Sequence, residues 1–136
     1  MTTDQELVAL AARAREAAYA PYSKYKVGAA LLAKSGKIYT GCNVENAVYS
    51  LTICAERTAV FKAVSEGEQA FEAIAVVTSN GGTPCGSCRQ VLAEFGLDTR
   101  VLIATPEEIV SEETVGTLLP GAFGPQDLPQ NERDCT

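Results

Sequence analysis

The sequence predicts an α/β domain in which helices cover both faces of a mixed β-sheet. Helical and strand periodicities alternate along the chain, which is typical of this class. Two of the expected strands, residues 73–77 and 101–104, are apolar throughout and therefore need cover on both sides. A length of 136 residues fits one domain with a core of its own.

The first helix is expected to begin with a capping box at Thr3-Asp4-Gln5-Glu6. In such a box the threonine hydroxyl accepts a hydrogen bond from one free amide, and the glutamate reaches back to another. Apolar residues then recur at helical spacing as far as Ala18, so the helix should stop near Pro21.

A β-hairpin is predicted next. The apolar run 27–33 and the segment 37–43 are separated by a Ser35-Gly36 turn. Residues 44–53 have no clean period and carry several polar side chains, so we expect a loop that presents them.

The second half of the chain should alternate helices with the two buried strands. Helices are predicted over 54–66 and 84–94, because a glycine stop signal follows each of them. A short helix is expected over 113–119, after the last buried strand.

The chain is expected to form a single domain over residues 1–136. Residues 120–136 are rich in Pro, Gly and polar residues and cannot form a core alone. This segment is therefore either a frayed tail or an arm that lies on a neighbouring subunit.

Composition excludes several kinds of site. The chain has no histidine, which rules out a Ser-His-Asp triad, a Cys-His pair and a histidine-ligated metal. Neither a secretory signal nor an apolar run long enough to cross a bilayer is visible, so we expect a cytoplasmic protein with no membrane partner. In that reducing compartment an odd set of five cysteines indicates metal ligands or reactive thiols. A net charge of −6 argues against a nucleic-acid partner and favours a neutral small molecule.

Three cysteines lie at predicted helix starts, where free amides and the helix dipole favour the thiolate that binds zinc. Cys85 and Cys88 are three residues apart and can share one metal ion, and Cys54 is the best candidate for a third ligand. The fourth tetrahedral position is then left for a water molecule, whose pKa zinc brings to about 7. Glu56 is expected to shuttle the proton, provided that Cys54 lies at the helix cap.

Three thiolates and one divalent zinc ion total a formal charge of −1, which something nearby should offset. Arg57 follows Glu56, and Arg89 follows Cys88. Either guanidinium is a candidate donor of charge-assisted hydrogen bonds to a thiolate, although both could be ordinary solvated helix residues.

Two other interpretations of the cysteines stay open at this point. A Cys-x-x-Cys motif also occurs in thiol oxidoreductases, but there it follows a strand in a thioredoxin-like unit. A closed structural zinc site with four sulfurs would form if Cys42 joined the set. Otherwise Cys42 is a small buried hydrophobic residue, and Cys135 lies at the terminus.

The motif Cys54-Ala55-Glu56, followed by Pro84-Cys85-Gly86-Ser87-Cys88, resembles the zinc deaminase signature in its three-cysteine form. Nearly the whole chain is similar to the short-chain, homotetrameric cytidine deaminases. That resemblance implies a three-layer α/β/α fold with a mixed sheet of about five strands. Further matching segments are 20–25, 27–31, 41–47, 85–90 and 119–123.

The resemblance implies a zinc-dependent enzyme of pyrimidine salvage, with one zinc ion per chain. Its reaction removes the amino group from C4 of cytidine or 2′-deoxycytidine by hydrolysis and gives uridine or 2′-deoxyuridine and ammonia. Glu56 then protonates the ring nitrogen and afterwards the leaving amine.

Substrate-binding residues are also implied by the resemblance. Asn43 and Glu45 match positions that bind the ribose, and Tyr25 matches an aromatic residue, usually Phe, that packs on the base. Backbone groups at Ala55 are expected to bind the base. Phe123, in the C-terminal arm, matches a ring that enters the site of a neighbouring subunit in the homotetramer.

Two alternative functions stay open. One is a deaminase of a cytosine-containing antibiotic such as blasticidin S, which shares the metal motif, although Asn43 and Glu45 favour cytidine. The other is a zinc- or RNA-binding module without catalysis, against which the acidity of the chain argues.

Overall fold

The computed structural model describes residues 1–129, which form a five-stranded sheet between two layers of helices. Only β3 and β4 pair in parallel; the other neighbouring strands are antiparallel, so the predicted mixed α/β sheet is confirmed. In the order β2-β1-β3-β4-β5 the strands are β1 (Gly28–Ala33), β2 (Ile38–Cys42), β3 (Phe71–Val77), β4 (Arg100–Ala104) and β5 (Ile109–Thr114). The helices are α1 (Asp4–Arg15), α2 (Ala55–Ser65), α3 (Gly86–Ala93) and α4 (Val115–Leu118), with short 3₁₀ turns at Tyr49–Leu51 and Pro125–Asp127.

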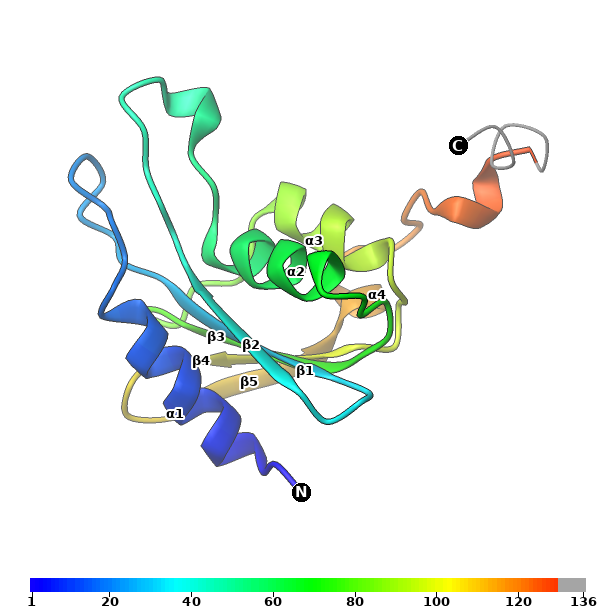
Figure 1. Ribbon diagram of the computed structural model, residues 1–136, viewed down its shortest axis with the longest axis horizontal. Helices are drawn as coiled ribbons and strands as arrows, with labels where there is room; N and C mark the ends of the chain where they lie inside the picture. Colours follow the sequence, from blue (N-terminus) through cyan, green and yellow to red (C-terminus); the bar gives the residue numbers. More distant parts are fainter. Residues whose placement is uncertain (130–136) are drawn as a thin grey trace.

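The sheet is buried on both faces, as the apolar character of β3 and β4 predicts. Helix α1 covers one face, and α2 and α3 cover the other (Figure 1). Gly28 and Gly41 permit this close contact, since a Cβ at Gly28 would lie 2.0 Å from the carbonyl oxygen of Ala11 in α1, and one at Gly41 would lie 2.7 Å from that of Ala55 in α2. The helices therefore pack directly on the strand backbones.

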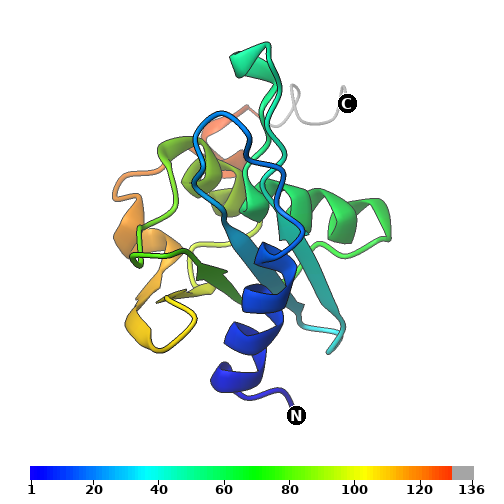
Figure 2. The same cartoon turned by 90° about the vertical axis from the view of Figure 1, so that its left-hand side faces the viewer.

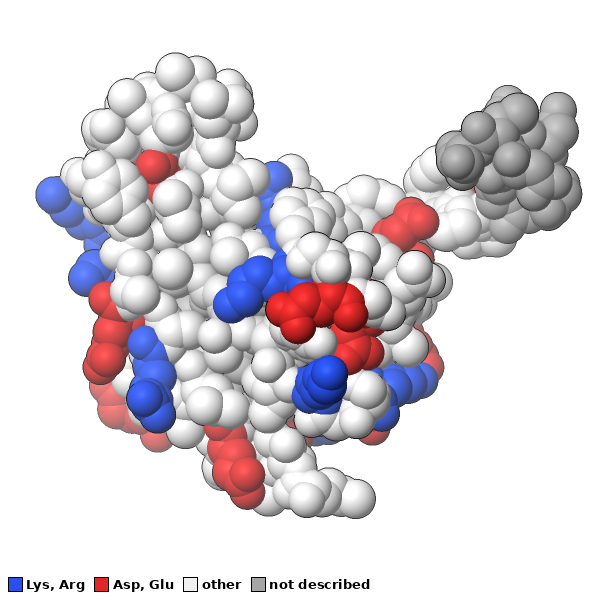
Figure 3. All heavy atoms as spheres, in the orientation of Figure 1, with Lys and Arg blue, Asp and Glu red and all other residues white. Residues whose placement is uncertain are grey.

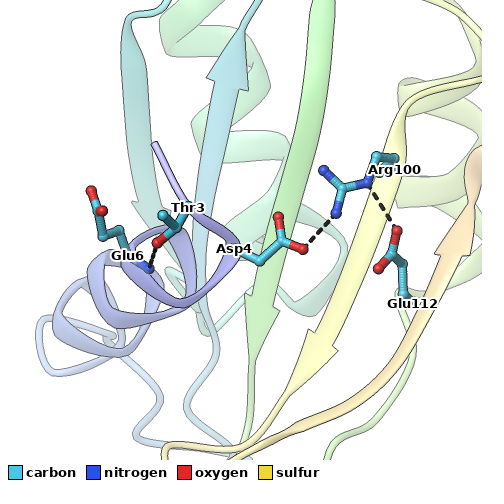
Figure 4. Close-up of polar contacts among 5 residues, drawn as sticks. All are labelled: Thr3, Asp4, Glu6, Arg100 and Glu112. Atoms are coloured by element: carbon cyan, nitrogen blue, oxygen red, sulfur yellow. Dashed lines mark hydrogen bonds and ion pairs between the residues drawn. The ribbon is translucent and has the colours of Figure 1, made fainter. Parts of the chain in front are cut away.

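Helix α1 begins at the predicted N-cap, Thr3, but within residues 1–129 only the Thr3 half of the expected capping box forms, since the Glu6 side chain accepts no hydrogen bond from a backbone amide. The amide of Glu6 donates to Oγ1 of Thr3 over 3.1 Å, and Arg100 of β4 forms ion pairs with Asp4 and with Glu112 of β5 (Figure 4). These pairs are about one-third exposed or more, so each contributes on the order of 0–1 kcal/mol. They join the start of α1 to the edge of the sheet.

Two boundaries differ from the sequence-based expectation. Helix α1 ends at Arg15 rather than near Pro21, although residues 16–18 continue in turns. Residues Ile109–Thr114 form β5, an edge strand that the sequence did not predict, and the helix expected from Glu113 begins only at Val115. Thr114 caps that helix, because its Oγ1 accepts from the amide of Thr117 over 3.2 Å.

Two long loops stand side by side at one end of the sheet (Figure 2). They comprise residues 16–27 and 43–54, and β-bridges join Tyr19 to Val44 and Val44 to Ile53. Within residues 1–129, no helix has both the length and the apolar character needed to cross a membrane.

The segment after α4 leaves the body of the domain (Figure 1). Leu119 and Ala122 at its start pack against the core, and Nε2 of Gln90 in α3 donates to the carbonyl oxygen of Phe123 over 2.7 Å. The Phe123 side chain is 57% exposed. Cys135 lies outside the described residues.

Candidate active site

The candidate site lies at the end of the sheet where strands β2 and β3 finish and strand β1 begins. Gly28 pairs with Cys42 at the end of β2 and with Val77 at the end of β3. Helices α2 and α3 start close to this end, and Cys54 and Cys85 are their N-cap residues. Open sheets commonly bind ligands at such an end.

Three sulfur atoms come together here. Sγ of Cys85 lies 3.8 Å from Sγ of Cys54 and 3.4 Å from Sγ of Cys88, and all three lie within 4.8 Å of one another. Cys54 is at the cap rather than inside α2, which was the condition for Cys54 and Glu56 to face the same site. Cys42, which is half-buried in β2, is not part of this group.

The sulfur group fits a zinc ion. A tetrahedral zinc ion with Zn–S bonds of about 2.3 Å keeps its sulfur ligands ~3.8 Å apart, close to the separations observed. Cys88 is fully buried and Cys85 is exposed, so the group is open on one side. Three ligands with one open side are typical of a catalytic zinc site rather than a closed structural one.

Arg57 contacts the sulfur group. Its Nη2 donates to Sγ of Cys54 over 3.3 Å, while its buried Nε has no hydrogen-bond partner among the described residues. The pKa of the Cys54 thiol is lowered to about 5, because Cys88 and then Arg57 donate hydrogen bonds to its sulfur. The pKa of the Cys88 thiol is raised, because the thiol donates a hydrogen bond to Cys54 and because it is buried. One thiolate is thus favoured before any metal binds.

Arg89 does not make the contact to a thiolate that the sequence suggested. Its Nε donates to the carbonyl oxygen of Pro84 and its Nη1 to that of Leu118, each over 2.8 Å. Its Nη2 donates to Oγ1 of Thr83 over 3.0 Å. All three nitrogens are engaged, so Arg89 holds the backbone that enters α3 instead of offsetting sulfur charge.

Glu56 lies in the first turn of α2 and is only 4% exposed. Burial raises the pKa of its carboxyl group to about 7, and the neighbouring Cys54 sulfur adds to the effect. A carboxyl group that titrates near neutrality both accepts and releases a proton readily at physiological pH.

A cavity of about 270 Å³ connects these groups. Its lining residues include Cys54, Cys85 and Glu56, together with Tyr25, Asn43 and Glu45. Ala55 is fully buried at the start of α2 and does not line the cavity with its side chain. Phe123 is not among the lining residues within this chain.

Asn43 and Glu45 are buried polar residues that hold the loop 16–27. Oδ1 of Asn43 accepts from the amide of Val27 over 2.9 Å, and its Nδ2 donates to the carbonyl oxygen of Tyr25 over 2.8 Å. The Glu45 carboxylate accepts from the amides of Tyr22 and Ser23 and from the Ser23 hydroxyl. Those hydrogen bonds lower the pKa of the Glu45 carboxyl group, and the one from the Ser23 hydroxyl contributes most. Burial acts in the opposite direction but is outweighed.

Comparison with known proteins identifies the family. Residues 1–105 match the cytidine and deoxycytidylate deaminase zinc-binding region. The chain is 54% identical to a cytidine deaminase of Sporosarcina psychrophila, over 91% of this chain and 93% of that protein. It is 53% identical to one of Halalkalibacterium halodurans, over 91% of this chain and 96% of that protein.

This chain belongs to the cytidine and deoxycytidylate deaminase family. Its fold agrees with a solved member, the cytidine deaminase from Burkholderia pseudomallei, with a TM-score of 0.86 and 49% identity over 90% of this chain and all of that chain. The family region is zinc-binding, and the three-sulfur group supplies a place for one zinc ion per chain.

Sequence reasoning missed several residues that line or support the cavity of this family member. Ser23 and Thr52 line it beside Glu45, and Asn80 accepts a hydrogen bond from the Tyr25 hydroxyl. Ser23 lies within a matching segment, so its link to Glu45 could have been suspected. Asn80 carries no local signal, because its contact is 55 residues away.

Proposed function

We propose that the protein is a zinc-dependent cytidine deaminase that converts cytidine and 2′-deoxycytidine to uridine and 2′-deoxyuridine with release of ammonia, a reaction of pyrimidine salvage. The observation that carries this proposal is the buried residue Glu56, which lines the same cavity of about 270 Å³ as Cys54 and Cys85 of the sulfur group. The relatives of similar length are named cytidine deaminases, which supports the same substrate.

Cys54, Cys85 and Cys88 are the proposed metal ligands. When bound, the zinc ion supplies the Lewis acidity that lowers the pKa of a water molecule in the site. The N-termini of α2 and α3 stabilise the thiolates through free amides and helix dipoles. Arg57 offsets the excess negative charge of three thiolates by its hydrogen bond to Cys54.

Glu56 is the proposed catalytic acid and base. It takes a proton from the attacking water and delivers it to the ring nitrogen N3 of the cytosine. It then takes the remaining proton from the hydroxyl group formed on C4 and passes it to the amino group, which leaves as ammonia while C4 becomes a carbonyl. Its raised pKa suits both directions of transfer, because neither the charged nor the neutral form is strongly favoured near pH 7.

Asn43, Glu45 and Tyr25 are the proposed nucleoside contacts. Asn43 and Glu45 are already oriented by hydrogen bonds to the backbone of 22–27, and each has remaining capacity to bind a sugar hydroxyl. The Tyr25 ring lines the cavity and offers a face on which a planar base packs. The backbone at Ala55, at the start of α2, is proposed to bind the base.

The working form is proposed to be a homotetramer in which Phe123, on the arm predicted over residues 120–136, enters the site of a neighbouring subunit; residues 130–136 of that arm lie outside the described residues. The lobe made by loops 16–27 and 43–54 shows few charged side chains (Figure 3). The large exposed apolar residues of this lobe are Tyr19, Tyr22, Tyr25, Val44, Val48, Tyr49 and Leu51. Helix α2 exposes one more, Phe61. An apolar surface of this kind on a chain of 136 residues is suited to burial against other subunits.

The proposed location is the cytoplasm, where a reducing environment keeps the cysteines available for metal. No nucleic-acid partner is proposed, because a net charge of −6 opposes a phosphate backbone.

A substrate panel tests the proposal. Purified protein should hold about one zinc ion per chain and shift the ultraviolet spectrum of cytidine toward that of uridine. Turnover of blasticidin S in preference to cytidine would redirect the substrate assignment, and zinc-loaded protein inactive on every cytosine nucleoside would contradict the proposed function.

A further inference from the structure

The hydroxyl group of Tyr25 is bound to another loop of the protein. It donates a hydrogen bond to Oδ1 of Asn80 over 2.7 Å. Tyr25 belongs to the loop 16–27, whereas Asn80 belongs to the loop between β3 and α3. The bond therefore joins two loops that the chain separates by 55 residues.

The Asn80 acceptor is itself fixed from the end of β3. Its Oδ1 also accepts from Oγ1 of Thr78 over 3.3 Å. Oγ1 of Thr78, a buried residue, in turn accepts from the amides of Gly81 and Gly82 over 2.8 and 2.9 Å. These bonds form an Asx- and Ser/Thr-type turn that sets where the Asn80 side chain points.

Gly82 leaves room for the same hydroxyl group. A Cβ at this position would lie 2.7 Å from Oη of Tyr25 but 3.9 Å from its Cζ. The hydroxyl oxygen thus occupies the space of a side chain that Gly82 lacks, and any larger residue would displace the tyrosine ring.

Tyr25 and Gly82 both line the cavity that Glu56 and two of the proposed zinc ligands, Cys54 and Cys85, also line. Tyr25 is exposed, and its hydroxyl group makes no other hydrogen bond within residues 1–129. Loss of the bond would free the ring to leave the cavity wall without touching Glu56 or a cysteine.

We propose that Asn80 is a positioning residue for the nucleoside: through the Tyr25 hydroxyl it holds the tyrosine ring at the cavity wall, where the base packs. The inference rests on the proposed function. A surface that is ordered before the substrate arrives costs less entropy on binding, so the contribution appears in KM. The reacting atoms are untouched, so kcat should not depend on Asn80.

The test is a double-mutant cycle with cytidine as substrate and the full-length zinc-loaded protein. Asn80→Ala and Tyr25→Phe should each raise KM by about two- to tenfold, the range expected for one hydrogen bond, with kcat within about twofold. The KM of the double variant should be no higher than that of the single variant with the higher KM, because both changes remove the same bond. Asn80→Asp keeps an oxygen that accepts from the Tyr25 hydroxyl, so the KM of this variant should be close to that of the wild type.

Gly82→Ala gives an independent arm. It should raise KM in the wild-type background, because the methyl group displaces the hydroxyl, and have little further effect on the Tyr25→Phe variant. Ser79→Ala is the matched control, since the Ser79 side chain is exposed and makes no hydrogen bond within residues 1–129. Its KM should equal that of the wild type.

Additive effects of Asn80→Ala and Tyr25→Phe on KM, or a loss confined to kcat, would overturn the inference. The proposed function would remain intact in that case, provided that the wild type is active. Unchanged KM in both single variants would also overturn it. An inactive wild type would remove the proposed function, and with it the inference.

Discussion

Nη2 of Arg57 donates a hydrogen bond to Sγ of Cys54 over 3.3 Å, and this is the one guanidinium that contacts the sulfur group among residues 1–129. Three thiolates exceed the charge of a zinc ion by one, and the Arg57 cation brings the total to zero. The contact also fixes the orientation of Cys54 at the cap of α2. Arg57 is therefore proposed to support both the charge and the geometry of the zinc site.

Arg57→Gln should lower cytidine turnover or zinc affinity by about 10- to 100-fold, the usual cost of losing a residue that supports a metal ligand. Zinc content and kcat are measured together. Arg13→Gln is the control, because Arg13 is exposed on α1 and its loss changes the net charge equally. Equal effects of the two changes would mean that only overall charge matters.

Cys85→Ser should abolish stable zinc binding, because two sulfur ligands remain, whereas Cys42→Ser should keep one zinc ion per chain. Metal analysis after dialysis against a weak chelator distinguishes the two variants. Loss of zinc from the Cys42→Ser variant would show that the ligand set is not the three-sulfur group.

Glu45→Gln should destabilise the protein near neutral pH, and the difference from the wild type should vanish in acid. The folded-state pKa of Glu45 is lowered from its usual 4.5, mainly by the Ser23 hydroxyl. A carboxyl group whose pKa is lowered by folding stabilises the folded state at pH values above its pKa in the unfolded chain. This stabilisation is lost as the pH falls through its pKa in the folded protein. Urea unfolding across the acid range measures the difference; a difference that does not shrink as the pH falls would contradict this origin.

Phe123→Ala should impair the site of a neighbouring subunit rather than its own. Co-expression of Phe123→Ala with Glu56→Gln chains should then create sites that combine an intact Glu56 with an intact Phe123 from a neighbour. Such mixed assemblies should bind cytidine more tightly than the Phe123→Ala protein alone. No recovery in the mixture would contradict a shared site.

Assembly is tested separately by light scattering after size exclusion. The full chain should elute as a tetramer. A chain truncated before Pro120 loses the arm that contains Phe123 and should have a raised KM. A full chain that is monomeric while turning over cytidine would contradict subunit-shared sites.

Local patterns in the sequence predicted the sulfur group. Cys85 and Cys88 share one predicted helix start, and Cys54 was the candidate third ligand because Ala55-Glu56 follows it; the structure brings the three sulfurs together. Residues 109–114 escaped prediction because Ser111, Glu112 and Glu113 give an edge strand little apolar alternation. Pairing with β4 makes them a strand.

Long-range contacts were beyond the reach of spacing arguments. Arg89 lies beside a proposed metal ligand in sequence, yet its guanidinium turns to the carbonyl oxygen of Leu118, 29 residues away. The bond between Tyr25 and Asn80 depends on where two loops meet above the sheet. Such contacts are set by tertiary packing, which no local pattern encodes.

The central claim is that Glu56 transfers protons beside a zinc ion bound by three cysteines. Comparison of Glu56→Gln with the wild type at equal zinc content, by the rate of conversion of cytidine to uridine, tests it most directly. The account predicts that zinc and fold are retained while kcat falls by at least about 10²–10⁴. A zinc-loaded Glu56→Gln protein with near wild-type kcat would contradict it.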